Sequence, residues 1–232
     1  MASNSKQFSH FWIDLHSLLN VAWIVALVWH NPQWMPWWIM TAGLSFLLLA
    51  FTTMRNLGFK PLGLGYANLV TIGRLLFLLA LGIFHQYLAD WLLFAGFLLI
   101  VILDGFDGKL ARKHNQTSEE GERLDAETDA QFVLILSWIL YDTQVVGWWI
   151  LIPGGLRYIY HLLFFYLPPN DSPPKKVRAT IAVVFFLSLT LAFLLPGHLS
   201  RPLLIGSSIL IFASFGLTLI RSCQLLLAHS KE

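Results

Sequence analysis

Residues 104–129 read DGFDGKLARKHNQTSEEGERLDAETD, a charged stretch that contains four aspartates, Asp104, Asp107, Asp125 and Asp129. The first two are three residues apart and the last two are four residues apart, so each pair lies on one face of a helix. Two helices that face each other across the short loop 113–124 would bring the four carboxylates into one pocket. We expect such a group to be functional, because carboxylates near hydrocarbon cost about 3 kcal/mol each on insertion scales.

The sequence around this stretch is apolar. Hydrophobic residues make up 56% of the 232 residues and charged residues only 12%, whereas soluble domains carry about 25% charged residues. A helix needs about 20 apolar residues to span a bilayer. Eight segments approach that length, near 11–30, 35–53, 66–85, 90–107, 125–141, 145–167, 178–195 and 202–222. We therefore predict an all-α polytopic membrane protein with about eight transmembrane helices.

Lysine and arginine positions orient these predicted helices. With the N-terminus in the cytoplasm, only Arg201 falls in an outer loop, and Arg74 and Arg157 fall inside predicted spans. The cytoplasmic segments then hold Lys6, Arg55, Lys60, Lys109, Arg112, Lys113, Arg123, Lys175, Lys176, Arg178, Arg221 and Lys231. Positive residues favour the cytoplasmic side, so we predict that both termini and the aspartates lie there. Seven tryptophans flank the outer loops, as expected for an aromatic belt.

The aspartate spacing also predicts a chemistry. Oxygen-rich sites suit hard divalent cations, and Mg²⁺ in particular is usually shared between a few carboxylates and substrate phosphates. Two such cations about 4 Å apart can clamp the oxygens of a displacement at phosphorus. Small side chains at Gly108 and Ala111 would let a nucleotide or a neighbouring helix approach. Arg112 could hold a phosphate through paired hydrogen bonds.

The stretch resembles the signature of the CDP-alcohol phosphotransferases, which are also called CDP-alcohol phosphatidyltransferases: D-x2-D-G-x2-A-R-x8-G-x3-D-x3-D. Besides the four aspartates, Gly108, Ala111, Arg112 and Gly121 match its fixed positions. A solvated charged loop would explain the neighbouring glutamates but not the spaced aspartates. The resemblance implies a catalytic unit of six membrane helices, which fits residues 63–225.

The rest of the chain falls on either side of that unit. We expect residues 1–62 to form a tail, two additional transmembrane helices and an interfacial linker, and residues 226–232 to form a cytoplasmic tail. We have no chemical role for the two leading helices.

The resemblance also implies roles for individual residues. Asp104, Asp107 and Asp125 would be metal ligands, and Asp129 would be both a ligand and the general base. The metal would be Mg²⁺ or Mn²⁺, with two ions at the site. Contacts to the CDP-alcohol would come from Asn68, Thr71, Gly108, Arg112 and Ser118. The first two of these belong to the segment ANLVTIGR, which resembles the N-x2-T-x2-R pattern of the family's first helix; helix capping is the alternative explanation for them.

Other polar residues allow more than one interpretation. Arg157 lies inside a predicted span, which allows two interpretations. It either has a structural role, in an ion pair or as a snorkelling side chain, or it contacts the acceptor substrate. Topology and attraction to anionic lipid explain the cluster Lys175, Lys176 and Arg178 without a substrate. Glu127 lies on a different face from its neighbouring aspartates, and Asp14, His16, His85 and His161 are expected to be solvated or locally bonded.

With the predicted topology, the family resemblance implies a phospholipid-synthesis enzyme of the bacterial inner membrane. It would transfer a phosphatidyl group from CDP-diacylglycerol to a small alcohol and release CMP, with its active site facing the cytoplasm. Arg157 slightly favours a phosphorylated acceptor over serine or choline. The resemblance implies a homodimer, and we expect membrane lipid but no nucleic acid as a further partner. The alternatives are a carboxylate-based transporter, which would couple flux to charge without releasing CMP, and a non-catalytic membrane assembly protein.

Overall fold

The computed structural model describes residues 2–29, 37–39, 41–45, 48, 65–113, 119–164, 167–168 and 172–229. These ranges contain helices, turns and connecting segments but no strand, which confirms the all-α prediction. The α-helices are α1 (Ala2–Trp29), α3 (Gly65–Phe84), α4 (Asp90–Lys113), α5 (Glu119–Asp142), α6 (Leu151–Phe164), α7 (Lys175–Leu191) and α8 (Gly197–His229). Two 3₁₀ turns, η2 (His85–Tyr87) and η3 (Trp148–Ile150), precede α4 and α6.

Each predicted span overlaps helix in the structure. The predicted segment 35–53 is helical at 37–39, 41–45 and 48, and its other residues lie outside the described part of the chain. Val70–Tyr87 and Gly197–Ala228 are long and apolar enough to cross a membrane. The number of spans and the cytoplasmic position of both termini remain predictions.

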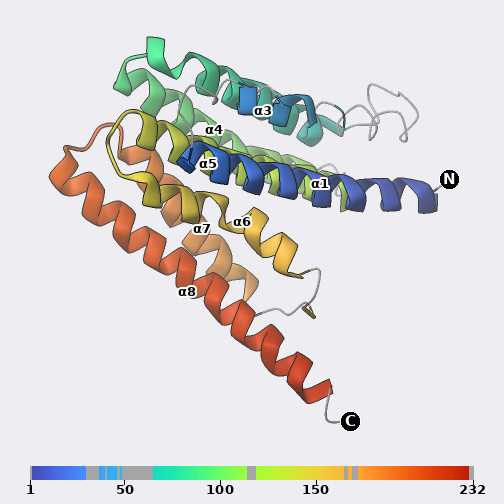
Figure 1. The fold of residues 1–232 in the computed structure, drawn as a ribbon. Helices are drawn as coiled ribbons and strands as arrows, with labels where there is room; N and C mark the ends of the chain where they lie inside the picture. The colour runs from blue at the N-terminus through green and yellow to red at the C-terminus, as the bar shows by residue number, and fades with distance from the viewer. Residues whose placement is uncertain are drawn as a thin grey trace.

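Helix α5 is the centre of the bundle. It packs against α3, α6 and α7, while α3 pairs with α4 and α7 pairs with α8 on either side of it (Figure 1). Ten consecutive residues of α5, 131–140, are buried. A helix enclosed on all sides must be apolar on all sides, and this part of α5 (QFVLILSWIL) is apolar except for Gln131 and Ser137. The charged first turns of α5 lie outside this buried stretch.

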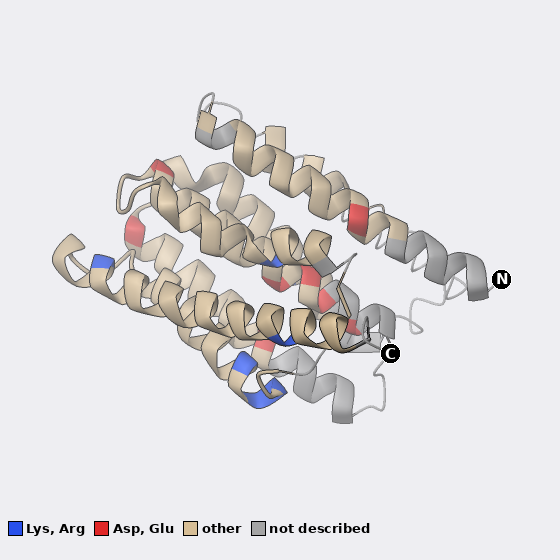
Figure 2. Ribbon diagram, turned by 60° about the horizontal axis from the view of Figure 1, so that its bottom comes forward, with Lys and Arg blue, Asp and Glu red and all other residues tan. Residues whose placement is uncertain are grey.

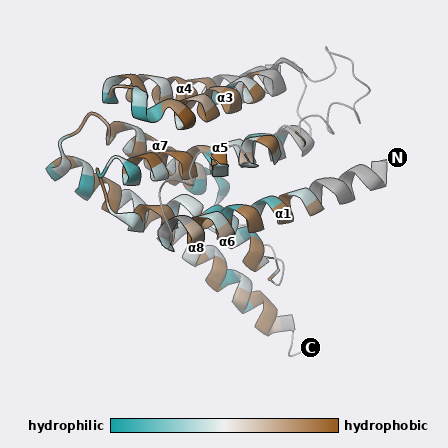
Figure 3. Ribbon diagram, turned by 45° about the horizontal axis from the view of Figure 1, so that its top comes forward, coloured by the Kyte–Doolittle hydropathy of each residue, from teal (hydrophilic) through white to brown (hydrophobic). Residues whose placement is uncertain are grey.

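The outer surface of the bundle is apolar. On α8 alone the large side chains of Ile205, Ile209, Phe212, Leu217 and Ile220 are exposed. Figure 3 shows hydrophobic residues along the length of the helices, and Figure 2 shows long stretches without charge. Soluble monomers rarely expose apolar patches of this extent. The surface is therefore that expected of a membrane protein.

A glycine allows α5 and α6 to approach closely. A Cβ atom added at Gly154 of α6 would lie 2.5 Å from Oγ and 2.7 Å from Cβ of Ser137 on α5. Contacts this short are incompatible with any side chain at position 154 unless the helices separate. Small residues play this part where membrane helices pack against each other.

Gly154→Ala should therefore destabilise the protein. Overpacking of a tight contact costs about 1–3 kcal/mol, which should appear as a lower thermal midpoint in detergent. Gly206→Ala in α8 is the matched control, because a Cβ there would meet no heavy atom within 4 Å among the described residues. An equal effect of both substitutions would contradict close packing at Gly154.

Candidate active site

Three of the four predicted aspartates meet in the structure. Asp104 lies in the C-terminal half of α4, and Asp125 and Asp129 lie one turn apart near the start of α5. Each contributes one carboxylate oxygen to a group whose members lie within 4.8 Å of one another. Asp107 follows Asp104 by one turn on α4, but its side chain lies outside the described part of the structure. The helix pair therefore gathers three of the carboxylates as the spacing predicts, and the place of Asp107 among them remains a prediction.

Arg74 of α3 provides the positive charge among these carboxylates. Its Nη2 lies 2.8 Å from Oδ1 of Asp104 and 2.9 Å from Oδ1 of Asp129. Its Nη1 donates to Oδ1 of Asp125 at 3.1 Å. The arginine is only 2% exposed, and a charge so deeply buried needs partners of opposite sign. The rule that an arginine inside a span needs a partner predicts that Arg74 is paired, but it does not say with which residues.

The three carboxylates suit a divalent cation. Around Mg²⁺ the ligand oxygens lie about 2 Å from the metal, so any two of them are about 3–4 Å apart. One oxygen each from Asp104, Asp125 and Asp129 lies within 4.8 Å of the other two, and the three Oδ1 atoms surround the positive charge of Arg74. The donor set therefore suits such an ion, provided that the oxygens draw slightly closer when it binds.

The remaining predicted donor contacts are described only in part. Thr71 is buried on α3, one turn before Arg74. Asn68 lies on the same helix, and Gly108 and Arg112 lie near the C-terminal end of α4, but their side chains are outside the described part. Ser118 is outside the described residues altogether. Their contacts with a CDP-alcohol remain predictions.

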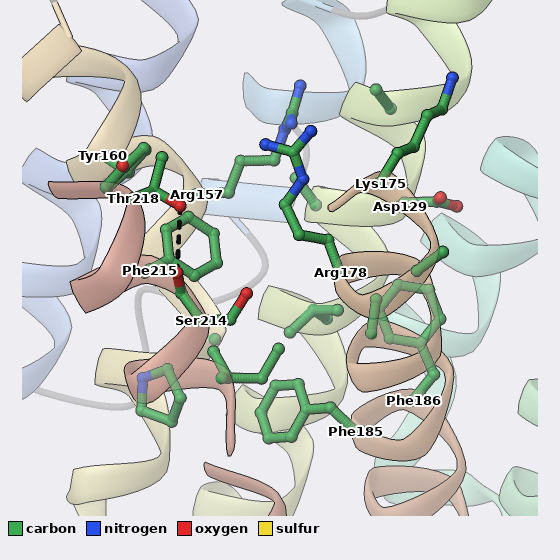
Figure 4. Close-up of a pocket in the computed structure, with 18 residues that line it drawn as sticks. Asp129, Arg157, Tyr160, Lys175, Arg178, Phe185, Phe186, Ser214, Phe215 and Thr218 are labelled. Atoms are coloured by element: carbon green, nitrogen blue, oxygen red, sulfur yellow. Dashed lines mark hydrogen bonds between the residues drawn. The ribbon is translucent and has the colours of Figure 1, made fainter. Parts of the chain in front are cut away.

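A cavity of about 730 Å³ opens beside the aspartates, between α5, α6, α7 and α8. Asp129 belongs both to the carboxylate group and to the wall of this cavity. In Figure 4 the cationic side chains lie toward one side of the cavity, whereas Phe185 and Phe186 lie toward the other. The cavity thus has a charged side and an apolar side, and Asp129 lies in its wall.

Three cations line the charged region: Arg157 of α6 and Lys175 and Arg178 of α7. Nη2 of Arg157 also lies 2.6 Å from Oε1 of Glu127, so this arginine has both a structural partner and a place in the cavity wall. Lys175 and Arg178 are three residues apart and share a face of α7. Membrane topology explains why these two residues are positively charged, but it does not explain why they line a cavity. Their three-residue spacing was the feature of the sequence that could have indicated a shared position. Basic side chains that converge in a cavity can bind an anionic group such as a phosphate.

Comparison with known proteins agrees with this site. The chain is 33% identical over 93 residues to the CDP-diacylglycerol--glycerol-3-phosphate 3-phosphatidyltransferase of Cereibacter sphaeroides. That match covers 38% of this chain and 42% of the relative, so the chain spans less than half of the relative's length. No solved structure matches the chain. Residues 64–220, which include every residue of the carboxylate group and of the cavity wall, match the family described as CDP-alcohol phosphatidyltransferase, and the chain therefore belongs to that family.

Proposed function

We propose that the chain transfers a phosphatidyl group from CDP-diacylglycerol to a phosphorylated small alcohol, glycerol 3-phosphate in the first instance, and releases CMP. The observation that carries this proposal is the position of Asp129. It lies both among the carboxylates that fit a metal ion and in the wall of a cavity with three cations. A nucleotide diphosphate and an anionic acceptor can therefore meet at one carboxylate.

On this proposal Asp104, Asp107, Asp125 and Asp129 hold Mg²⁺ or Mn²⁺, two ions per site by family resemblance. When bound, the ions neutralise charge on the diphosphate and on the departing CMP. Arg74 is buried against three of the four carboxylates and keeps them close together. Gly108, Arg112, Ser118, Asn68 and Thr71 are assigned to the CDP-alcohol.

The acceptor occupies the cavity. Arg157, Lys175 and Arg178 hold its phosphate, which directs its hydroxyl toward Asp129. Oδ1 of Asp129 is paired with Arg74, so we assign Oδ2 to take the hydroxyl proton. The acceptor oxygen forms a bond to the β-phosphorus as the bond from that phosphorus to the CMP oxygen breaks. Positioning and charge neutralisation supply most of the catalysis in phosphoryl transfer.

The relative and the cavity both support a phosphorylated acceptor. The Cereibacter sphaeroides protein is named for glycerol 3-phosphate, and three cations exceed what a neutral alcohol needs. The six-helix unit 63–225 would carry the reaction in a multi-pass protein of the bacterial inner membrane. Its aspartates would face the cytoplasm, and the chain would form a homodimer in contact with membrane lipid.

Arg74 and a divalent cation should neutralise the same carboxylates. Arg74→Met should therefore lower thermal stability more strongly in EDTA than in Mg²⁺. Removing one partner of a fully buried ion pair costs about 3 kcal/mol; the loss here should be smaller because the aspartates are partly exposed, and a bound cation would offset part of it. Thermal unfolding in detergent under both conditions measures the difference. Arg221→Met, at an exposed position of α8, is the control, and equal losses for Arg74→Met in EDTA and Mg²⁺ would argue against a shared site.

Acceptor-dependent CMP release tests the reaction directly. Purified protein supplied with CDP-diacylglycerol and Mg²⁺ should release CMP with glycerol 3-phosphate, and not with serine or choline. EDTA should abolish release, and an excess of Mg²⁺ should restore it. Asp129→Asn should reduce the rate at least about 100-fold, because it removes the proton acceptor, while the thermal midpoint stays close to that of the wild type.

Undiminished turnover by Asp129→Asn would remove the base assignment. CMP release with serine alone would keep the family reaction but overturn the phosphorylated acceptor.

Arg178→Gln should raise KM for glycerol 3-phosphate by about ten-fold, since each lost charge-assisted hydrogen bond weakens binding by roughly that factor. KM for CDP-diacylglycerol should stay unchanged. Lys176→Gln is the matched control, because Lys176 is exposed on the same turn of α7 and is not among the residues that line the cavity. If the control raised the acceptor KM as much as Arg178→Gln, a general loss of surface charge would explain both.

A further inference from the structure

Helix α1 packs against the catalytic unit although it lies outside the family match. The matched region begins at residue 64, but α1 runs along α6, the helix that carries Arg157 (Figure 1). The two helices are closely packed at Gly155, where an added Cβ would clash with Ile24 of α1. The position of α6 therefore depends on α1.

One polar contact and one aromatic contact join α1 to α6. Oδ1 of Asp14 lies 2.8 Å from Nε2 of His161, which is one turn after Arg157 on α6. The buried ring of His16 stacks on Trp12, with 4.6 Å between centroids, and meets Tyr158 edge-on at 5.8 Å. The α6 residues in contact with α1 are thus Tyr158, which follows Arg157 directly, and His161, one turn farther on.

Helix α6 also contacts the buried part of α5. The hydroxyl of Tyr158 donates to Oε1 of Gln131 at 2.9 Å, and Nη2 of Arg157 donates to Oε1 of Glu127 at 2.6 Å. Glu127 and Gln131 are one turn apart, so α5 presents one acceptor to each of two adjacent residues of α6. These contacts together fix both the rotation of α6 and the direction of the Arg157 guanidinium.

The burial of Glu127 lowers the stability of the fold. It is 3% exposed, and its second oxygen, Oε2, has no hydrogen-bond partner among the described residues. A buried carboxylate with one unsatisfied oxygen lowers the stability of a fold, so its presence calls for a role other than stability. Its one described partner, Arg157, lies in the wall of the cavity beside Asp129.

We propose that Glu127 is a positioning residue for acceptor recognition, and that α1 completes the arrangement by holding α6 through Asp14 and His161. Glu127 directs the Arg157 guanidinium, and α1 keeps the backbone of Arg157 at the distance that this contact requires. The proposal rests on the proposed function, because it takes the cavity as the acceptor site. It also gives the N-terminal helix a role in the reaction.

Steady-state kinetics with CDP-diacylglycerol and glycerol 3-phosphate test the proposal. Glu127→Ala should raise KM for glycerol 3-phosphate about ten-fold and leave KM for CDP-diacylglycerol unchanged. Glu127→Gln should recover part of the loss, because an amide oxygen still accepts from Nη2. In an Arg157→Gln background, Glu127→Ala should add no further effect on the acceptor KM, since residues that act through one contact are not additive.

The Asp14–His161 pair has a matched control at the C-terminal end of α5. Asp142 and His85 form a carboxylate–histidine pair at 2.9 Å, away from the cavity. Asp14→Asn should raise the acceptor KM, whereas Asp142→Asn should not, even if both lower the thermal midpoint. The comparison separates positioning from general stability.

An unchanged acceptor KM in Glu127→Ala, together with an active wild type, would overturn the positioning role and leave the proposed function in place. Equal changes in the KM of both substrates, or an additive effect in the Arg157→Gln background, would overturn it as well. If the wild type released no CMP with any phosphorylated alcohol, the proposed function would fail first, and the role of Glu127 in acceptor recognition would fail with it.

Discussion

One buried arginine holds the carboxylates of this protein together. Arg74 lies within ion-pair distance of Asp104, Asp125 and Asp129, and it joins α3 to α4 and α5. The guanidinium is almost completely buried, whereas the carboxylates are partly exposed, so the arginine in particular could not stay charged there without them. The positions of the three helices are therefore linked, because any shift that separated the charges would leave one of them without a partner. The carboxylates are held on helices rather than on loops, which favours a precise site.

Different faces of helix α5 make different contacts. Asp125 and Asp129 face Arg74, while Ala126 and Ala130 line the cavity with Asp129. Glu127 points toward α6 and Arg157. At 100° per residue, positions 125 and 129 lie about 40° apart, whereas position 127 lies on the far side of the helix. A short stretch of α5 can therefore contact Arg74, the cavity and α6.

Much of this architecture follows from short-range pattern. Long apolar segments must be helical in a membrane, because each backbone group needs a hydrogen bond within its own segment, and the predicted segments overlap the observed helices. The aspartates were found because helical spacing places i, i+3 and i+4 on one face. The same rules could not pair Asp14 with His161, which are separated by 147 residues. They also left Lys175 and Arg178 as charges at a membrane surface.

The sequence by itself determined the helical class, the positions of most helices and the carboxylates that form the candidate metal site. Periodicity and hydropathy are local properties, and the motif is contained in two adjacent helices. Only the tertiary structure decided that Arg74 lies among those carboxylates, that α6 and α7 contribute cations to one cavity with Asp129, and that α1 supports α6. These contacts join segments far apart in the chain, and they depend on how the helices pack, which no local pattern encodes.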